Sequence, residues 1–306
     1  MGERVEITEV GPRDGLQNAH GRMATAAKQR WIRALVAAGL RSIEVGSFVP
    51  PKLIPQMADT DAIVRDAVTL PGLRVVALAP NLRGAQAAHA AGAHAVTIPV
   101  SASEAHSRSN TNKSPDEQIA EVARIVEWVR AQARPMEVEA GVSTAFGCSM
   151  MGVVPVAQVV HVAAGLAGAG VSSLALCDTV GYAHPALIHE TVRAVRGAIG
   201  PVLQILHLHD TMGLGMANAL AGIEEGIRRF DSALAGLGGC PFAPGASGNI
   251  STEDLVFMLE SMGFETGIDL AALIATRALL AEALPDERLR GQVAQAGIPK
   301  TFRRAA

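Results

Sequence analysis

The sequence has few aromatic residues, little charge and almost no cysteine. Aromatic side chains make up 3% of its 306 residues and charged side chains 18%, with a formal net charge of −3. These values exclude a polycation that binds nucleic acid, and an apolar content of 49% excludes a disordered acidic segment. Three cysteines (Cys148, Cys177 and Cys240) are too few for a disulfide framework, so we expect a reducing, cytoplasmic setting.

Charged residues are absent between Ala140 and Cys177, which at first suggests a membrane segment. A membrane-spanning helix needs about 20 consecutive apolar residues, and this stretch is interrupted by glycines, Pro155 and Gln158. It predicts a strand at 138–143, an amphipathic helix at 155–167 and a strand at 172–177. We therefore expect a soluble protein without a membrane partner. A first strand near Val5 leaves no room for a signal peptide at the start of the sequence.

Short β-rich runs alternate with longer helical patterns along most of the chain. The strands recur about every 30 residues, the length of one strand-plus-crossover unit, and eight of them predict a (β/α)8 TIM barrel. The alternative is a doubly wound open sheet, but no glycine-rich dinucleotide fingerprint follows the first strand. The predicted strands are Val5–Val10, Ser42–Gly46, Arg74–Ala79, Ala95–Val100, Met136–Val142, Ser172–Cys177, Leu203–His209 and Phe230–Ala235.

We expect a single domain over residues 1–306. The barrel occupies about 4–236, a glycine-rich loop follows at 236–249, and capping helices lie within 252–290. Helical periodicity predicts helices at 114–133 and 216–229 in the barrel, and at 252–262 and 270–284 in the cap.

Polar residues stand where the predicted strands end, which is where a TIM barrel carries its active site. His207 and His209 are two residues apart on a strand, so their imidazoles point to the same face, with Cα atoms roughly 6–7 Å apart. Asp14 and Asn249 are candidate oxygen ligands beside them. A nitrogen and oxygen set without thiolate suits Mg²⁺ or Mn²⁺ better than structural zinc. The alternative is that one histidine only satisfies a buried hydrogen bond.

Three further residues are candidates for chemistry. Glu44 lies inside an apolar strand and needs a partner, for which Arg13 is suited, although Arg13 and Asp14 could instead form a solvated turn pair. Cys240 lies in the glycine-rich loop, which suggests a lid that brings a thiol over the substrate. A thiol pKa of about 8.5 suits protonation of a carbanion. The alternative is an inert thiol in a turn.

The densest of these motifs resemble the 3-hydroxy-3-methylglutaryl-CoA (HMG-CoA) lyase family, within the metal-dependent lyase and synthase superfamily of TIM barrels named for its Asp-Arg-Glu residues. The resemblance runs from Val10 to about Leu259 and is most specific over Gly239–Leu255. It implies a metal-dependent retro-Claisen cleavage of HMG-CoA, an acyl-CoA thioester, to acetyl-CoA and acetoacetate, as in leucine catabolism and ketone body formation. We expect a homodimer.

The resemblance also assigns roles to residues. It implies metal ligands at Asp14, His207, His209 and Asn249, and catalytic roles for Arg13, Asp14, Glu44, His207 and Cys240. Arg13 would stabilise the thioester enolate oxygen, Cys240 would protonate the carbanion, and Asp178 is a candidate for positioning the substrate.

Some positions differ from the family pattern, and they leave the substrate open. Ser149-Met150-Met151, Met212 and His20 replace residues that the family usually carries near the pocket rim. A related 3-hydroxyacyl-CoA therefore competes with HMG-CoA as the expected substrate. The sequence also leaves open a Claisen-condensing synthase of the same superfamily and a catalytically silent metal-binding scaffold. Candidate contacts for the CoA phosphates, weighed against simple surface roles, are Lys52, Arg83, Arg108 and Lys113.

Overall fold

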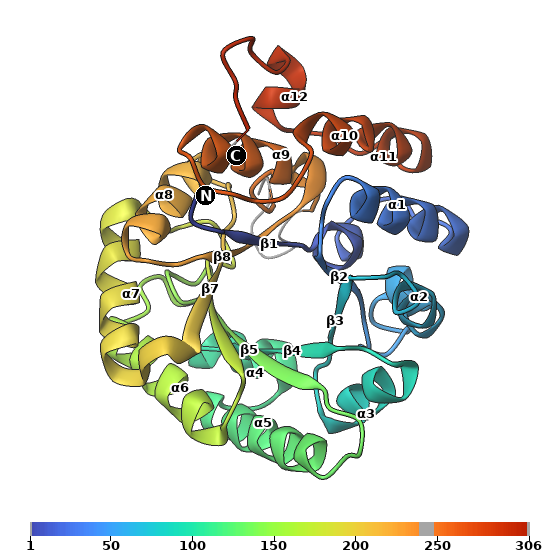
Figure 1. The fold of residues 1–306 in the computed structure, drawn as a ribbon. Helices are drawn as coiled ribbons and strands as arrows, with labels where there is room; N and C mark the ends of the chain where they lie inside the picture. The colour runs from blue at the N-terminus through green and yellow to red at the C-terminus, as the bar shows by residue number, and fades with distance from the viewer. Residues whose placement is uncertain (1, 239–247, 305–306) are drawn as a thin grey trace.

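The computed structural model describes residues 2–238 and 248–304. Its eight strands are parallel, pair in chain order and close when β8 pairs with β1, which confirms the predicted TIM barrel (Figure 1). The strands are β1 (Glu6–Glu9), β2 (Ser42–Ser47), β3 (Arg74–Leu78), β4 (Ala95–Ser101), β5 (Glu137–Ser143), β6 (Ser173–Cys177), β7 (Leu203–His207) and β8 (Arg229–Ser232).

Helices form a ring around the barrel (Figure 1). They are α1 (Thr25–Ala37), α2 (Thr60–Ala67), α3 (Leu82–Ala91), α5 (Pro115–Arg130), α6 (Val156–Ala169), α7 (Pro185–Ile199) and α8 (Gly215–Glu224). The short helix α4 (Glu104–Thr111) follows β4 and lies inside this ring in the view of Figure 1. The sequence accounts well for α5. Ser114 and Glu117 form a capping box at its start, and its apolar face, including Val122 and Ile125, is buried against the barrel. The uncharged stretch forms the last four residues of β5 together with α6 and β6. None of the helices among residues 2–238 and 248–304 is long and apolar enough to span a bilayer.

Charged side chains form a layer inside the barrel. Glu139 of β5 contacts Arg74 of β3 at 3.0 Å, Arg229 of β8 at 2.9 Å and Ser173 of β6 at 2.7 Å. Side chains from four strands around the ring can meet only in the interior. Burial raises the cost of ionising Glu139, but the two guanidinium groups outweigh it and hold its pKa below the usual value. The layer therefore fills the interior below the polar mouth.

The C-terminal region differs in detail from the predicted cap. The expected helix at 270–284 is divided at Thr276 into α10 (Leu270–Ala275) and α11 (Arg277–Ala283), after α9 (Thr252–Ser261). A further short helix, α12 (Gln292–Ala296), lies beyond the predicted end of the cap. The helix expected at 216–229 ends at Glu224, because Gly226 adopts a φ of 77° and the chain turns into β8. The assignment of residues 1–306 to a single domain stays a prediction.

Candidate active site

A tight helical turn after β1 places Arg13 and Asp14 at the mouth of the barrel. Residues Gly11–Gly15 form one turn of π-helix, in which the N–H groups of Arg13 and Asp14 donate to the carbonyl of Val10. Arg13 Nε donates to Glu44 Oε2 at 2.5 Å, and Arg13 Nη1 donates to Asp14 Oδ1 at 2.5 Å. The guanidinium therefore bridges the carboxylate of the turn after β1 and the carboxylate inside the neighbouring strand β2, and all three side chains are buried.

His207 is the last residue of β7, and His209 lies two residues further along the chain. Both side chains point toward Asp14. Their Nε2 atoms lie 3.2 Å apart. Asp14 Oδ2 lies 3.8 Å from His207 Nε2 and 3.7 Å from His209 Nε2. Ligand atoms of these three residues all lie within 4.8 Å of one another, which makes a possible metal site.

Asn249, which lies just before α9 and far from Asp14 in the sequence, also belongs to this cluster. Its backbone forms an isolated bridge with His209, and its Nδ2 donates to Asp14 Oδ2 at 2.7 Å. The approach depends on glycine, because a Cβ on Gly248 would lie 2.3 Å from the carbonyl oxygen of Gly238. The segments on either side of residues 239–247 are thereby held together beside the cluster.

The donor set of this cluster fits a divalent cation. Asn249 Oδ1 is buried and has no hydrogen-bond partner among residues 2–238 and 248–304, although a buried amide oxygen is costly to leave unpaired. A bound cation would satisfy it. Two imidazole nitrogens, a carboxylate and an amide oxygen form a mixed nitrogen and oxygen site without thiolate.

Charges in the cluster also favour ligation. Burial opposes the ionisation of Asp14, but Arg13 and both histidines outweigh it and hold the pKa of that carboxyl well below its usual range. Burial lowers the pKa of His209, which favours the neutral imidazole that a metal requires. For His207, the hydrogen bond to Asp231 and the charges of Asp14 and Asp231 together exceed the effect of burial and raise the pKa. Burial raises the pKa of Glu44 to about 7 against the attraction of Arg13.

Asp178 is buried at the end of β6 and directs its side chain to the backbone. Its carboxylate accepts N–H groups from Tyr182 at 2.9 Å and from Ala183 at 3.2 Å. Burial raises its pKa to about 7 in spite of these hydrogen bonds. The contacts hold the loop between β6 and α7, and the structure does not bring Asp178 into the cluster of Asp14 and the histidines. Its role with substrate stays a prediction.

Sequence reasoning missed Asp231 of β8. Its Oδ2 lies 3.2 Å from His207 Nδ1, on the side of the ring opposite the cluster. A signal was available, because an acidic residue inside a predicted barrel strand is the feature that identified Glu44. That signal is weaker for Asp231, because it stands between Phe230 and Ser232, whereas Glu44 has an apolar residue on each side.

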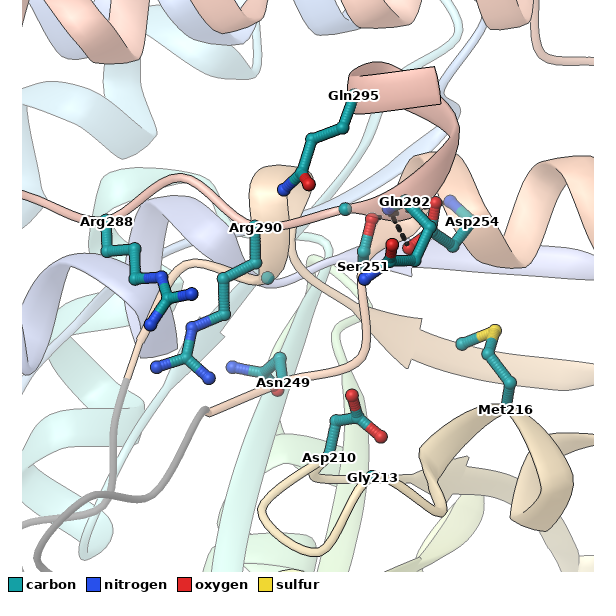
Figure 2. Close-up of a pocket in the computed structure, with 12 residues that line it drawn as sticks. Asp210, Gly213, Met216, Asn249, Ser251, Asp254, Arg288, Arg290, Gln292 and Gln295 are labelled. Atoms are coloured by element: carbon teal, nitrogen blue, oxygen red, sulfur yellow. Dashed lines mark hydrogen bonds between the residues drawn. The ribbon is translucent and has the colours of Figure 1, made fainter. Parts of the chain in front are cut away.

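The sequence also did not point to a cavity of about 460 Å³ beside Asn249. Arg288 and Arg290, which follow α11, line it and extend toward Asn249 (Figure 2). Neither guanidinium forms an ion pair with a carboxylate in the part of the chain that the structure describes. Burial and the charge of Arg288 lower the pKa of Arg290, against the attraction of Asp210. Such a pair of arginines favours an anionic ligand.

Comparisons with known proteins agree with this geometry. A family model described as HMGL-like matches residues 4–280. The chain is 40% identical to the mitochondrial hydroxymethylglutaryl-CoA lyase of Mus musculus over 294 residues, which are 96% of this chain and 90% of the relative. It is also 40% identical to the hydroxymethylglutaryl-CoA lyase of Pseudomonas mevalonii over 271 residues, 89% of each protein.

Among solved structures, an HMG-CoA lyase from Acinetobacter baumannii in complex with coenzyme A and 3-methylmalate has a TM-score of 0.91 to this chain. The two are 39% identical, and the match covers 98% of this chain and 97% of the other. The chain belongs to the HMGL-like family.

The structure does not add the other predicted residues of this HMGL-like chain to the cluster. Cys240 lies outside the described residues. Arg108 forms an ion pair with Glu104 at 2.8 Å, and Lys113 one with Glu121 at 3.2 Å, which favours a surface role for both. The remaining candidate phosphate contacts, Lys52 and Arg83, are exposed.

The positions that differ from the pattern of the HMGL-like family lie on exposed loops or in contact with the C-terminal region. Met150, Met151 and Met212 are exposed on the loops after β5 and β7. His20 contacts Glu287 through its Nδ1 at 3.1 Å. This contact joins the loop after β1 to the segment that carries Arg288 and Arg290.

Proposed function

We propose that this protein cleaves 3-hydroxy-3-methylglutaryl-CoA to acetyl-CoA and acetoacetate, in a retro-Claisen reaction that depends on a divalent metal. The observation that carries the proposal is the position of Asp14. One of its carboxylate oxygens faces His207, His209 and Asn249, while the other accepts a hydrogen bond from Arg13. The candidate metal site and a fixed guanidinium therefore adjoin each other, and the curated relatives are named for this activity.

Asp14, His207, His209 and Asn249 would hold the metal. When bound, a divalent metal supplies charge that lowers the pKa of the substrate 3-hydroxyl and orients the adjacent carboxylate. Mg²⁺ and Mn²⁺ are the ions that this donor set favours. His207 or Asp14 removes the proton from the 3-hydroxyl. His207 can do so only while its Nε2 is not bound to the metal, whereas a carboxylate oxygen of Asp14 keeps a free lone pair. The C2–C3 bond then breaks, and its electron pair moves toward the thioester.

Arg13 stabilises the charge that develops on the thioester oxygen. Its Nε and Nη1 are held by Glu44 and Asp14, which leaves Nη2 to donate to the substrate. Because both carboxylates fix the guanidinium before substrate arrives, little further ordering is needed during the reaction. Cys240 then gives a proton to C2, which completes acetyl-CoA. These products would place the reaction in leucine breakdown and ketone body formation.

The reaction itself is the first prediction. We expect the protein to release acetyl-CoA and acetoacetate from HMG-CoA with added Mg²⁺ or Mn²⁺, and to lose this activity when the metal is removed with a chelator. In a panel of 3-substituted glutaryl thioesters, kcat/KM should be highest for the methyl compound. C240S and H207A serve as inactive references. A folded protein that releases no acetyl-CoA with either metal would contradict the proposal, and a preference for a longer substituent would reassign the substrate.

The arginine pair in the cavity beside Asn249 is our candidate site for the CoA phosphates. We expect R288A/R290A to raise KM for HMG-CoA by about 10- to 100-fold, since charge-assisted hydrogen bonds contribute about 1.5–3 kcal/mol. The value of kcat should change little. A short thioester without the nucleotide, such as the N-acetylcysteamine compound, tests the assignment because its KM should be the same in both proteins. An equal rise in KM for both substrates, or no rise for HMG-CoA relative to R303A, would refute it.

Assembly and location are also proposals. We propose a homodimer, which light scattering of the full chain would test. We propose a cytoplasmic location on the strength of the three cysteines. The relative from Mus musculus is named as mitochondrial.

A further inference from the structure

We propose that Asp231 is a positioning residue that fixes the tautomer of His207 and so prepares it to bind the metal. The inference rests on the proposed function, because it assumes that a metal binds at Asp14, His207 and His209. It assigns a role to a carboxylate on β8 that does not itself belong to the ligand set. Its basis is the geometry of the two ring nitrogens of His207.

The barrel register places the two side chains next to each other. His207 of β7 is paired with Asp231 of β8, and residues paired in a ladder project from the same face of the sheet. Asp231 is also paired with Thr8 of β1, whose side chain bonds to Ser42 across the next pair of strands. Asp231 therefore points into the barrel behind His207, and only 19% of its side chain is exposed.

The two nitrogens of His207 face different partners. Nδ1 lies 3.2 Å from Asp231 Oδ2, whereas Nε2 lies 3.2 Å from His209 Nε2 and 3.8 Å from Asp14 Oδ2. A carboxylate can only accept at Nδ1, so the proton of the neutral ring resides there. Nε2 is then left with its lone pair directed into the cluster. Metal-binding histidines commonly have such a carboxylate partner, which also increases the basicity of the ligand.

Two comparisons within the cluster support a positioning role. The group of residues whose ligand atoms converge consists of Asp14, His207 and His209, so Asp231 stands behind the ligands. In contrast, His209 Nδ1 is buried without a hydrogen-bond partner in the described parts of the chain. Of the two imidazoles, His207 is thus the one that a carboxylate holds in a defined tautomer, and we expect it to provide the more strongly oriented nitrogen.

The test combines metal affinity with the state of the ring, measured on the full chain without substrate. We expect D231N to raise the Kd for Mn²⁺, measured by titration calorimetry, by about 10- to 100-fold. In ¹⁵N-histidine-labelled protein, long-range ¹H–¹⁵N spectra should show His207 protonated at Nδ1 in the unaltered chain, and a population protonated at Nε2 in D231N. D231E keeps the carboxylate and should recover part of the affinity.

A matched control removes a carboxylate of similar exposure elsewhere. Asp66 has a side chain that is 23% exposed and is paired with Arg33 at 2.6 Å, so D66N should bind Mn²⁺ as the unaltered protein does. Unchanged Mn²⁺ affinity in D231N would overturn the inference, and so would weaker binding with His207 still protonated only at Nδ1. If the unaltered protein binds no Mn²⁺, the proposed function fails together with this inference.

Discussion

D14N is expected to abolish metal binding and to lower kcat by about 10³-fold or more. Asp14 is the only carboxylate of the convergent ligand group within the described residues, and its Oδ2 faces His207, His209 and Asn249. An amide cannot supply the negative charge that offsets the cation. A metal ion contributes several kcal/mol of charge stabilisation, and each 1.36 kcal/mol is a factor of ten in rate. Calorimetry with Mn²⁺ and acetyl-CoA release give the two measurements.

The fold should survive this substitution. Asn has nearly the volume of Asp, and Arg13 keeps its hydrogen bond to Glu44 at 2.5 Å. The matched control is D61N, because Asp61 is an exposed carboxylate that is paired with Arg65 of its own helix. We expect D61N to have the activity and Mn²⁺ affinity of the unaltered protein. If D14N bound Mn²⁺ with unchanged affinity, the cluster would not be the metal site.

R13K is expected to lower kcat by about 10²- to 10³-fold, the usual loss for one donor that stabilises a developing oxyanion. Lysine keeps the charge but has a single nitrogen, so it cannot bridge Glu44 and Asp14 and also donate to the substrate. The ligands of the metal remain in place, so Mn²⁺ binding should be retained. Steady-state kinetics and calorimetry therefore distinguish R13K from D14N, which should lose both properties.

The buried carboxylate of Glu44 gives R13K a second measurable effect. A lysine that reaches Asp14 leaves Glu44 without its partner, and breaking a buried ion pair costs about 3–5 kcal/mol. We expect a lower free energy of unfolding, which denaturant titration measures. R65K is the control, because Arg65 forms an exposed i,i+4 pair with Asp61 and the substitution should change neither rate nor stability. Unchanged kcat in R13K would remove Arg13 from the catalytic residues.

Local sequence was sufficient to predict the barrel. Alternation of strands and helices about every 30 residues and the apolar face of α5 both follow from periodicity along the chain. The uncharged segment from Ala140 to Cys177 is explained in the same way, because it comprises the end of β5, α6 and β6, and strands covered on both faces can omit charge. Details that depend on contacts across the fold were less predictable, such as the division of the C-terminal cap into α10, α11 and α12.

The residues of the site also fall into those that local sequence predicts and those that depend on tertiary contacts. Arg13, Asp14, His207 and His209 could be named from the sequence because each stands at or just after the end of a barrel strand, and the ends of parallel strands meet at one mouth. Glu44 could be named because it is a carboxylate inside an apolar strand. The pairing of Asp231 with His207 was decided by the register between β7 and β8, which no local pattern encodes. The position of Arg288 and Arg290 beside Asn249 was decided by the course of the chain after α11, where Glu287 contacts His20 of the loop after β1. Sequence therefore determined which groups are available for chemistry. Tertiary structure decided which of these groups are in contact, because hydrogen bonds and ion pairs act over a few ångströms and join residues that are far apart in the chain.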